Sequence, residues 1–363
     1  MVVSHVQNIG TDEFYLNLCL QSAWQNQLIT LPNPAVSALI LDQYGTILSL
    51  ESHQECGKPH AEVLALQKAY AKLSGDCEIL RLSDSAQIHQ YLLKCSQNLF
   101  NKTTIYVSLE PCGSHKCGRT PSCTSLLKAL KPKRIIIATQ DRSQNAKGGA
   151  EELEQCGIPV TKAWETKNLT SIHQCANSLL YPFNALQTKG RFLLYKYACR
   201  LDGSINGGQI SSKAAQSKMH DYRAKADFLL LSGKTIREDK PTLDARFASL
   251  ESKRPPNILI LTRDNNFSTD APLFDIPNRE VKILNQINPT LQNINGFIMC
   301  EGGAELLSAL QPHIDMLLVI LQPSFNADFT LTMRLRLSFH LVHSMQIGED
   351  LFLWLLPKNQ PML

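Results

Sequence analysis

The sequence contains no hydrophobic run that is long enough to cross a lipid bilayer. The longest apolar run near the end of the chain covers residues 316–321, whereas a membrane-spanning helix needs roughly 20 residues. Residues 1–10 have neither an apolar core nor a basic leader, so we expect no secretory signal. These absences predict a soluble, cytoplasmic protein that does not contact membranes.

A strong excess of either charge is also absent. The formal net charge is +4, and the chain has no basic stripe with interleaved aromatic residues. We therefore do not expect nucleic acid as a partner, whereas small phosphorylated metabolites are compatible with this charge. Hydrophobic residues make up 44% and charged residues 19%, as in an ordinary globular protein. Because one core rarely exceeds roughly 250–300 residues, the 363 residues predict two domains.

The cysteines do not form the even set that a disulfide framework requires. There are 11 of them, and the expected absence of a secretory signal also argues against disulfides. We expect most of them to be reduced core thiols, among them Cys19 and Cys175, which occur in helical apolar patterns. Only the cluster from Cys112 to Cys123 calls for a chemical explanation.

Strand-like and helix-like runs alternate in the first half of the chain, which predicts α/β layering. A helix is predicted over residues 61–73, and strands are predicted over residues 36–41, 105–109 and 134–138. We interpret residues 74–102 as an insertion with its own helix over residues 85–99.

A second alternating set predicts another α/β domain. Its predicted strands cover residues 192–198, 228–231, 257–261, 281–284 and 297–300. We expect a linker at residues 186–190 and therefore domains over residues 1–187 and 188–363. No internal repeat or low-complexity tract is present.

One cluster has the residue types of a catalytic zinc site. His60 stands at the start of a predicted helix, Cys112 follows a predicted strand, and Cys123 precedes another helical run. One imidazole and two thiolates leave one position of a tetrahedral zinc open for water. Glu62, two residues after His60, can then move the proton of that water, as in the generic signature of zinc deaminases. The sequence therefore predicts zinc held by these three residues, with Glu62 as the catalytic acid and base.

The spacing of the cysteines leaves an alternative open. The short signature has two residues between its cysteines, whereas residues 113–122 separate Cys112 from Cys123 here. A structural zinc loop could instead use Cys112, Cys117 and Cys123, with His60 as the fourth ligand. Such a site would not need a glutamate two residues from its histidine.

These motifs resemble the family of bifunctional riboflavin-biosynthesis proteins, which join a pyrimidine deaminase to a reductase. The resemblance covers about residues 14–321 and rests on four sequence motifs. They are Pro32-Asn33-Pro34, Lys58-Pro59-His60-Ala61-Glu62, the run from Glu110-Pro111-Cys112 to Gly118-Arg119-Thr120-Pro121-Ser122-Cys123, and Leu201-Asp202-Gly203. It implies a domain similar to cytidine deaminase, followed by one similar to dihydrofolate reductase.

The resemblance also implies the reactions and the ligands. The first domain would deaminate a phosphoribosylated diaminopyrimidinone, and the second would reduce its ribose to a ribityl chain with NADPH. Asn33 would lie on the substrate side of the deaminase. In the reductase the implied substrate residues are Arg223, Leu243, Arg246 and Glu301, and the implied cofactor residues are Ala198, Thr235, Asp239, Thr262 and Gly303. A homo-oligomer is compatible with this reading.

Two features of the residues themselves agree with a phosphorylated ligand. The small-residue turn at Ser232 to Thr235 and the pair Gly302-Gly303 each follow a predicted strand, where backbone N–H groups can meet a phosphate. Two arginines suit a sugar phosphate, because a guanidinium group binds phosphate in bidentate fashion.

Departures from the family pattern keep other functions open. Lys240 replaces an acid and Gln209 replaces a tryptophan, so a deaminase with an inactive reductase half is one alternative. A nucleic-acid deaminase is a second, and a non-catalytic, zinc-stabilised binding module is a third. The loop between Cys112 and Cys123 is two residues longer than is usual in the family.

Overall fold

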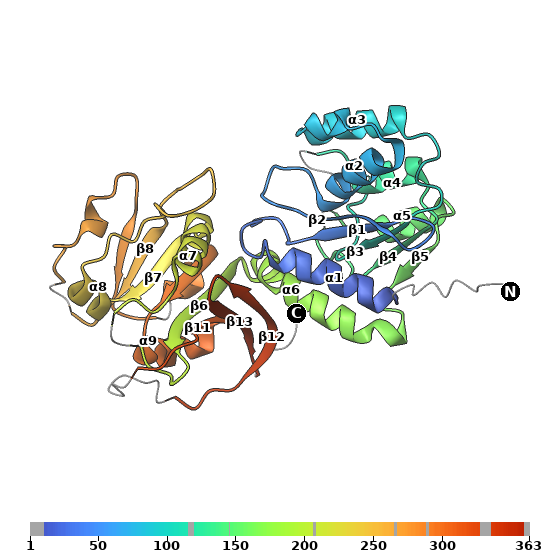
Figure 1. Ribbon diagram of the computed structural model, residues 1–363. Helices are drawn as coiled ribbons and strands as arrows, with labels where there is room; N and C mark the ends of the chain where they lie inside the picture. Colours follow the sequence, from blue (N-terminus) through green and yellow to red (C-terminus); the bar gives the residue numbers. More distant parts are fainter. Residues whose placement is uncertain are drawn as a thin grey trace. The chain divides into compact units, whose positions relative to one another are not determined.

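The computed structural model describes residues 11–114, 120–144, 146–205, 208–264, 267–287, 290–326 and 335–358. The chain divides into two compact units, Met1–Phe183 and Asn184–Leu363. Each unit is built on one β-sheet with helices packed against it (Figure 1). None of the helices in the described ranges combines the length and the apolarity that a membrane span requires.

The first unit contains a five-stranded sheet in the order β2-β1-β3-β4-β5. Its strands are β1 (Ser37–Leu41), β2 (Ile47–Ser52), β3 (Thr104–Val107), β4 (Arg134–Ile137) and β5 (Val160–Lys162). β1 runs antiparallel to both of its neighbours, whereas β3, β4 and β5 are parallel. Because β3 and β4 are buried along almost their whole length, they are short apolar runs rather than alternating ones.

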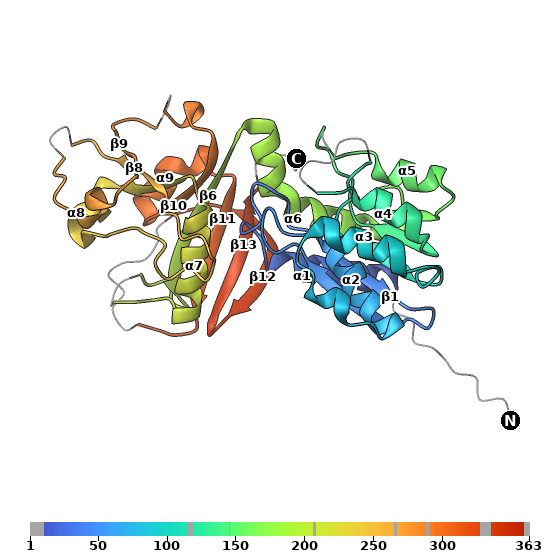
Figure 2. The ribbon, with the colours of Figure 1, turned by 90° about the horizontal axis from the view of Figure 1, so that it is seen from above.

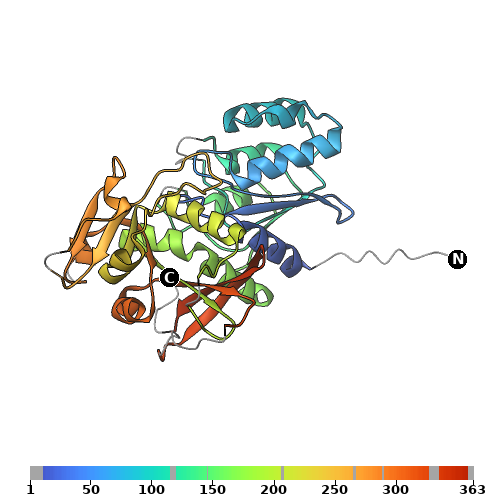
Figure 3. The same ribbon diagram turned by 60° about the vertical axis from the view of Figure 1, so that its left-hand side comes forward.

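Helices cover both faces of this sheet. They are α1 (Asp12–Trp24), α2 (Ala61–Ser74), α3 (Ser85–Cys95), α4 (Cys123–Leu130), α5 (Gly149–Gln155) and α6 (Thr170–Lys189), with 3₁₀ turns η1 (Glu78–Arg81) and η2 (Lys167–Leu169). Figure 1 shows α2, α3 and α4 on one face and α1 on the other. The predicted insertion forms η1 and α3, and α3 packs beside α2 (Figure 3).

Local signals in the sequence set the ends of the helices near the site. α2 begins directly after His60 and ends at Gly75, whose left-handed φ of 75° suits glycine. Ser122 caps α4, because its hydroxyl oxygen accepts the amide hydrogen of Ser125. The predicted helix over residues 85–99 ends earlier, at Cys95, and residues 186–189 of the predicted linker belong to α6.

The second unit contains an eight-stranded sheet in the order β12-β13-β11-β6-β10-β7-β8-β9. Its strands are β6 (Arg191–Arg200), β7 (Phe228–Ser232), β8 (Asn257–Leu261), β9 (Val281–Leu284), β10 (Gly296–Glu301), β11 (Met316–Gln322), β12 (Phe339–Ile347) and β13 (Asp350–Pro357). The pairs from β11 to β9 are parallel, so the carboxyl ends of β6, β10 and β7 meet at one edge.

Within the described ranges, three further helices and three 3₁₀ turns belong to this unit. They are α7 (Lys213–Lys225), α8 (Gly233–Asp239), α9 (Ala304–Leu310), η3 (Pro272–Asp275), η4 (Thr290–Asn293) and η5 (Gln311–His313). α7 and α9 lie on opposite faces of the sheet (Figure 2). Leu306 and Leu310 of α9 pack in a core with Tyr195 of β6, whereas Tyr222 of α7 meets the ring of Trp354.

The sequence predicted five of the eight strands of this sheet but not β11, β12 and β13. β12 and β13 form an antiparallel hairpin, coloured dark red in Figure 3, which adds to the sheet beside β11. β13 alternates buried and partly exposed residues, with Phe352, Trp354 and Leu356 directed into the core.

The prediction of a core thiol is confirmed for Cys19 and wrong for Cys175. Ten cysteines fall in the described ranges, and all ten are free thiols. Cys19 is buried, but Cys175 and three others are exposed: Cys56, Cys77 and Cys156. Cys175 is an exposed residue of α6, because a helical apolar pattern fixes a stripe and not every residue near it.

Candidate active sites of the two units

Three residues from separate segments of the first unit come together at the end of β3. His60 directly precedes α2, Cys112 follows β3, and Cys123 is the first residue of α4. Their ligand atoms all lie within 4.8 Å of one another, which is close enough for the three residues to bind one metal ion together. One imidazole and two thiolates are a donor set that suits zinc, so these residues fit the metal.

The histidine presents one nitrogen to the cysteines. His60 Nδ1 lies 3.4 Å from Cys123 Sγ and 3.9 Å from Cys112 Sγ. His60 Nε2 lies 3.3 Å from Thr120 Oγ1, so the hydroxyl can orient the ring through its other nitrogen. The amide of Cys123 also donates to Cys112 Sγ, at 3.3 Å, which ties the two cysteines together.

Glu62 lies in the first turn of α2, two residues after His60. Its side chain is buried, with a residue exposure of 4%. A carboxylate is rarely buried without a functional or pairing reason, and the helix start brings it to the same end of α2 as the histidine.

His53 connects the substrate-side loop to this cluster, and sequence analysis missed it. Asn33 Nδ2 lies 3.2 Å from His53 Nε2, and His53 Nδ1 lies 3.1 Å from the carbonyl oxygen of Pro59. Burial lowers the pKa of His53 to about 4, so the ring is neutral at neutral pH. Because Asn33 Nδ2 can only donate, Nε2 accepts and Nδ1 donates to Pro59. The only available signal was a lone histidine seven residues before His60, which is too weak by itself.

Glu110 is a second residue that sequence analysis did not single out as functional. Its buried carboxylate accepts the amide hydrogens of Asp141, at 2.9 Å, and of Ala150, also at 2.9 Å. Gly148 N donates to the same carboxylate at 3.2 Å. Burial raises the pKa of Glu110, and these amides oppose that shift. The residue therefore fixes the turn before α5 against the segment that leads to Cys112.

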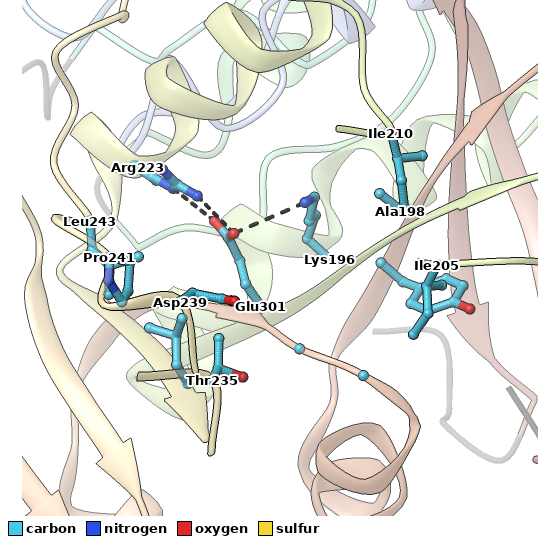
Figure 4. Close-up of a pocket in the computed structure, with 14 residues that line it drawn as sticks. Lys196, Ala198, Ile205, Ile210, Arg223, Thr235, Asp239, Pro241, Leu243 and Glu301 are labelled. Carbon is cyan, nitrogen blue, oxygen red and sulfur yellow. Dashed lines mark hydrogen bonds and ion pairs between the residues drawn. The ribbon is translucent and has the colours of Figure 1, made fainter. Parts of the chain in front are cut away.

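A cavity of about 410 Å³ opens in the second unit, where β6, β7 and β10 end (Figure 4). Seven residues expected at the reductase site line it: Ala198, Arg223, Thr235, Asp239, Leu243, Glu301 and Gly303. Lys196 lines it as well. The topology explains this convergence, because ligands of parallel sheets bind outside the carboxyl ends of the strands.

Three charges form the polar wall of this cavity. Arg223 donates two hydrogen bonds to Glu301, from Nε at 2.8 Å and from Nη2 at 2.7 Å. Lys196 Nζ lies 4.0 Å from Glu301 Oε2 (Figure 4). Burial by itself would raise the pKa of Glu301, but the charges of Arg223 and Lys196 outweigh it and hold that pKa at about 2. Burial lowers the pKa of Lys196 and outweighs its attraction to Glu301.

Comparison with known proteins identifies the family of each unit. The model of the cytidine and deoxycytidylate deaminase zinc-binding region matches residues 9–139, and the model of the RibD C-terminal domain matches residues 191–352. The chain belongs to the RibD family. The predicted order of a deaminase unit and a reductase unit, each with an α/β fold, is thereby confirmed.

Individual relatives of the chain carry the RibD name. The riboflavin biosynthesis protein RibD of Aquifex aeolicus is 31% identical over 256 residues, which cover 69% of this chain and 61% of that protein. The RibD protein of Mycobacterium tuberculosis strain H37Rv is 26% identical over 321 residues, which cover 86% of this chain and 80% of that protein.

Solved RibD structures share the fold over nearly the whole chain. The RibD of Acinetobacter baumannii, form 1, gives a TM-score of 0.63 at 24% identity and covers 96% of this chain and 99% of that chain. A diaminohydroxyphosphoribosylaminopyrimidine deaminase/5-amino-6-(5-phosphoribosylamino)uracil reductase from Thermotoga maritima gives a TM-score of 0.61 at 22% identity and covers 95% of this chain and 98% of that chain.

Two residues expected at the reductase site of this RibD-family chain do not line the cavity. Thr262 follows β8, and a Cβ placed on Gly233 would lie 2.7 Å from its Cβ, so the start of α8 packs directly on it. Arg246 is 51% exposed, and its Nε donates to Asp244 Oδ1 at 2.8 Å. Its guanidinium group also stacks on Phe247.

Two departures from the RibD pattern, Lys240 and Gln209, lie on the surface of the reductase unit. Lys240 ends α8 and forms an exposed ion pair with Asp270, at 2.6 Å. Gln209 is exposed and donates to the carbonyl oxygen of Ser211, at 3.0 Å. Ser232 to Thr235, expected as an open turn, is the capped start of α8, where Ser232 Oγ accepts from Thr235 N. Cys117 of the alternative zinc loop lies outside the described residues.

Proposed function

We propose that the chain is a bifunctional enzyme of riboflavin biosynthesis. The first unit hydrolyses an amino group from a diaminopyrimidinone that carries a phosphoribosylamino group, and the second reduces the ribosyl group to ribityl with NADPH. The observation that supports this most directly is the convergence of His60, Cys112 and Cys123 beside a buried Glu62. Family membership and the cavity of the second unit support the reductase step.

In the deaminase site His60, Cys112 and Cys123 would hold zinc, with His60 using Nδ1. The chemistry that zinc supplies in such a site is activation of a water molecule at neutral pH. Glu62 would take the proton from the attacking water and deliver it to the leaving amine, since its buried carboxylate belongs to the first turn of the helix that follows His60. Asn33 and the neutral His53 offer polar contacts to the ring.

In the reductase site the charged wall would position the sugar. Arg223, Glu301 and Lys196 fix one side of the cavity, and Leu243 adds an apolar contact. Ala198, Thr235, Asp239 and Gly303 form the cofactor side, with Thr262 behind α8. Hydride transfer depends on holding nicotinamide and sugar at reacting distance, so these groups act mainly through positioning.

One assay tests both halves. Purified protein receives the diamino substrate with and without NADPH, and ammonia release and NADPH absorbance are followed separately. We expect ammonia without NADPH, and NADPH oxidation only after deamination. Ammonia without any substrate-dependent loss of NADPH would favour the second candidate, a deaminase with an inactive reductase half, which Lys240 and Gln209 suggest.

Several further properties belong to this proposal. The partner is a small phosphorylated pyrimidine and not nucleic acid, in keeping with a net charge of only +4. The expected location is the cytoplasm, and a homo-oligomer is compatible with the chain.

Removing zinc should abolish deamination while the unit stays folded, whereas a purely structural zinc module should unfold.

A further inference from the structure

A single carboxylate on α5 joins the two segments that carry the cysteines of the deaminase site. Glu152 Oε1 accepts the amide hydrogen of Ser114, at 2.9 Å, and Glu152 Oε2 accepts its hydroxyl hydrogen. Glu152 Oε2 also accepts from Lys128 Nζ, at 3.0 Å. Ser114 stands two residues after Cys112, and Lys128 lies on the helix that begins with Cys123.

The backbone beside Cys112 is enclosed by the same structure. Gly113 is buried, and its amide donates to the carbonyl oxygen of Ala146, at 2.9 Å. A Cβ at Gly113 would lie 3.1 Å from Glu152 Oε1 and 3.1 Å from the carbonyl oxygen of Lys147. The segment from Cys112 to Ser114 is therefore held between α5 and the turn that precedes it, with little room for a side chain at Gly113.

Helix α5 is itself fixed, so it can act as an anchor. Glu110, two residues before Cys112, accepts the amide hydrogens of Gly148 and Ala150 at the start of this helix. Burial would raise the pKa of Glu152, but the hydrogen bonds from Ser114 and the charge of Lys128 outweigh it and lower that pKa. Glu152 therefore carries its charge at neutral pH and can keep all three hydrogen bonds.

We infer that Glu152 is a positioning residue that holds Cys112 and Cys123 at the separation that zinc requires. The inference rests on the zinc site of the proposed function. The loop between the two cysteines is long, covering residues 113–122, and the cross-link through Glu152 fixes its first part to α4. Groups that orient metal ligands without touching the metal typically change its affinity by about 10–100-fold.

The test measures zinc affinity in the full chain. The zinc dissociation constant of each protein is determined by competition with a chelator, and the rate of zinc release is recorded. We expect Glu152→Ala to bind zinc about 10–100-fold more weakly. Glu152→Gln should be intermediate, because its amide oxygen still accepts from the Ser114 amide but has lost the charge that attracts Lys128.

Glu151→Ala is the matched control. Glu151 is the neighbouring carboxylate on α5, is 57% exposed, and lies 3.4 Å from Lys162 rather than beside the cysteine segments. This variant should keep the wild-type zinc affinity. The thiolate-to-cobalt absorption of Co²⁺-loaded protein gives a readout that is independent of activity, and it should change in Glu152→Ala but not in Glu151→Ala.

The outcomes separate this inference from the proposed function. If Glu152→Ala binds zinc as tightly as the wild type, the inference is overturned and the zinc site of the proposed function still stands. The inference is also overturned if Glu151→Ala loses as much zinc affinity as Glu152→Ala. Absence of zinc binding in the wild type would overturn both. If circular dichroism shows that Glu152→Ala does not fold, Glu152→Gln and Ser114→Ala decide the question, since each removes part of the same contact, and wild-type affinity in both overturns the inference.

Discussion

Arg223 and Glu301 lie side by side on one wall of the reductase cavity and share two hydrogen bonds, at 2.8 and 2.7 Å. Both residues were expected to bind substrate. The pair forms one polar wall, with Lys196 beside it. Because the guanidinium group and the carboxylate bind each other, fewer of their hydrogen-bonding atoms can contact a ligand. The remaining atoms are fixed in direction, which favours precise placement of a sugar.

This pair makes the stability of the chain depend on pH. The folded-state pKa of Glu301 is about 2, below the ordinary value of 4.5, so its stabilising contribution is complete above 4.5 and is lost as the pH falls toward 2. We expect the unfolding free energy of the wild type to fall in that window with a slope steeper than that of Glu301→Gln. The difference in slope should approach about 1.4 kcal/mol per pH unit, and chemical denaturation at several pH values measures it. Glu305→Gln, at an exposed position on α9, should follow the wild type.

Glu62→Gln should separate metal binding from deamination. Glu62 is not among the residues whose ligand atoms converge, so zinc content should remain that of the wild type. Ammonia release should fall by roughly 10²–10⁴-fold, which is the usual effect of general acid–base catalysis. Zinc analysis and an ammonia assay measure both. Near-normal ammonia release would remove Glu62 from the mechanism. The same variant should still oxidise NADPH when it is given the deaminated substrate.

Cys123→Ser and Cys117→Ser should distinguish the two zinc arrangements. Cys123 Sγ lies 3.4 Å from His60 Nδ1, so Cys123→Ser should lose zinc. Cys117→Ser should keep it if Cys117 stands outside the ligand set. Metal analysis after dialysis against a chelator reads out the result. Loss of zinc in both variants would favour the structural zinc loop, whereas loss in Cys117→Ser with retention in Cys123→Ser would put Cys117 in the place of Cys123 in the ligand set.

Arg246→Ala and Asp239→Ala should affect different ligands of the reductase. Arg246 is exposed, and its guanidinium group contacts Asp244 and Phe247. An exposed guanidinium group can meet a phosphate, so its loss should raise the KM for the substrate with little change in kcat. Asp239 lines the cavity, and its loss should raise the KM for NADPH. Steady-state kinetics with each ligand varied in turn measures both effects. Unchanged KM for the substrate in Arg246→Ala would remove that residue from the site.

The sequence by itself was sufficient for several strands and helices of each unit and for the residue types of the zinc cluster. His60 and Glu62 had to share the first turn of one helix, and the buried runs of β3 and β4 carried enough β-branched residues to be recognised as strands. Such features are local, because a helix start or a short apolar run is encoded in a few consecutive residues.

Contacts between distant segments were decided by the tertiary structure alone. His53 meets Asn33, Glu152 meets Ser114, and Arg223 meets Glu301 across separations of 20, 38 and 78 residues. The hairpin of β12 and β13 joins the sheet by pairing with β11, and the sequence showed the residues of β11 only as a short apolar run. The hydrophobic pattern of a sequence indicates which side chains are buried. Which of these side chains contact each other depends on how the helices and strands pack, and this packing depends on the whole chain.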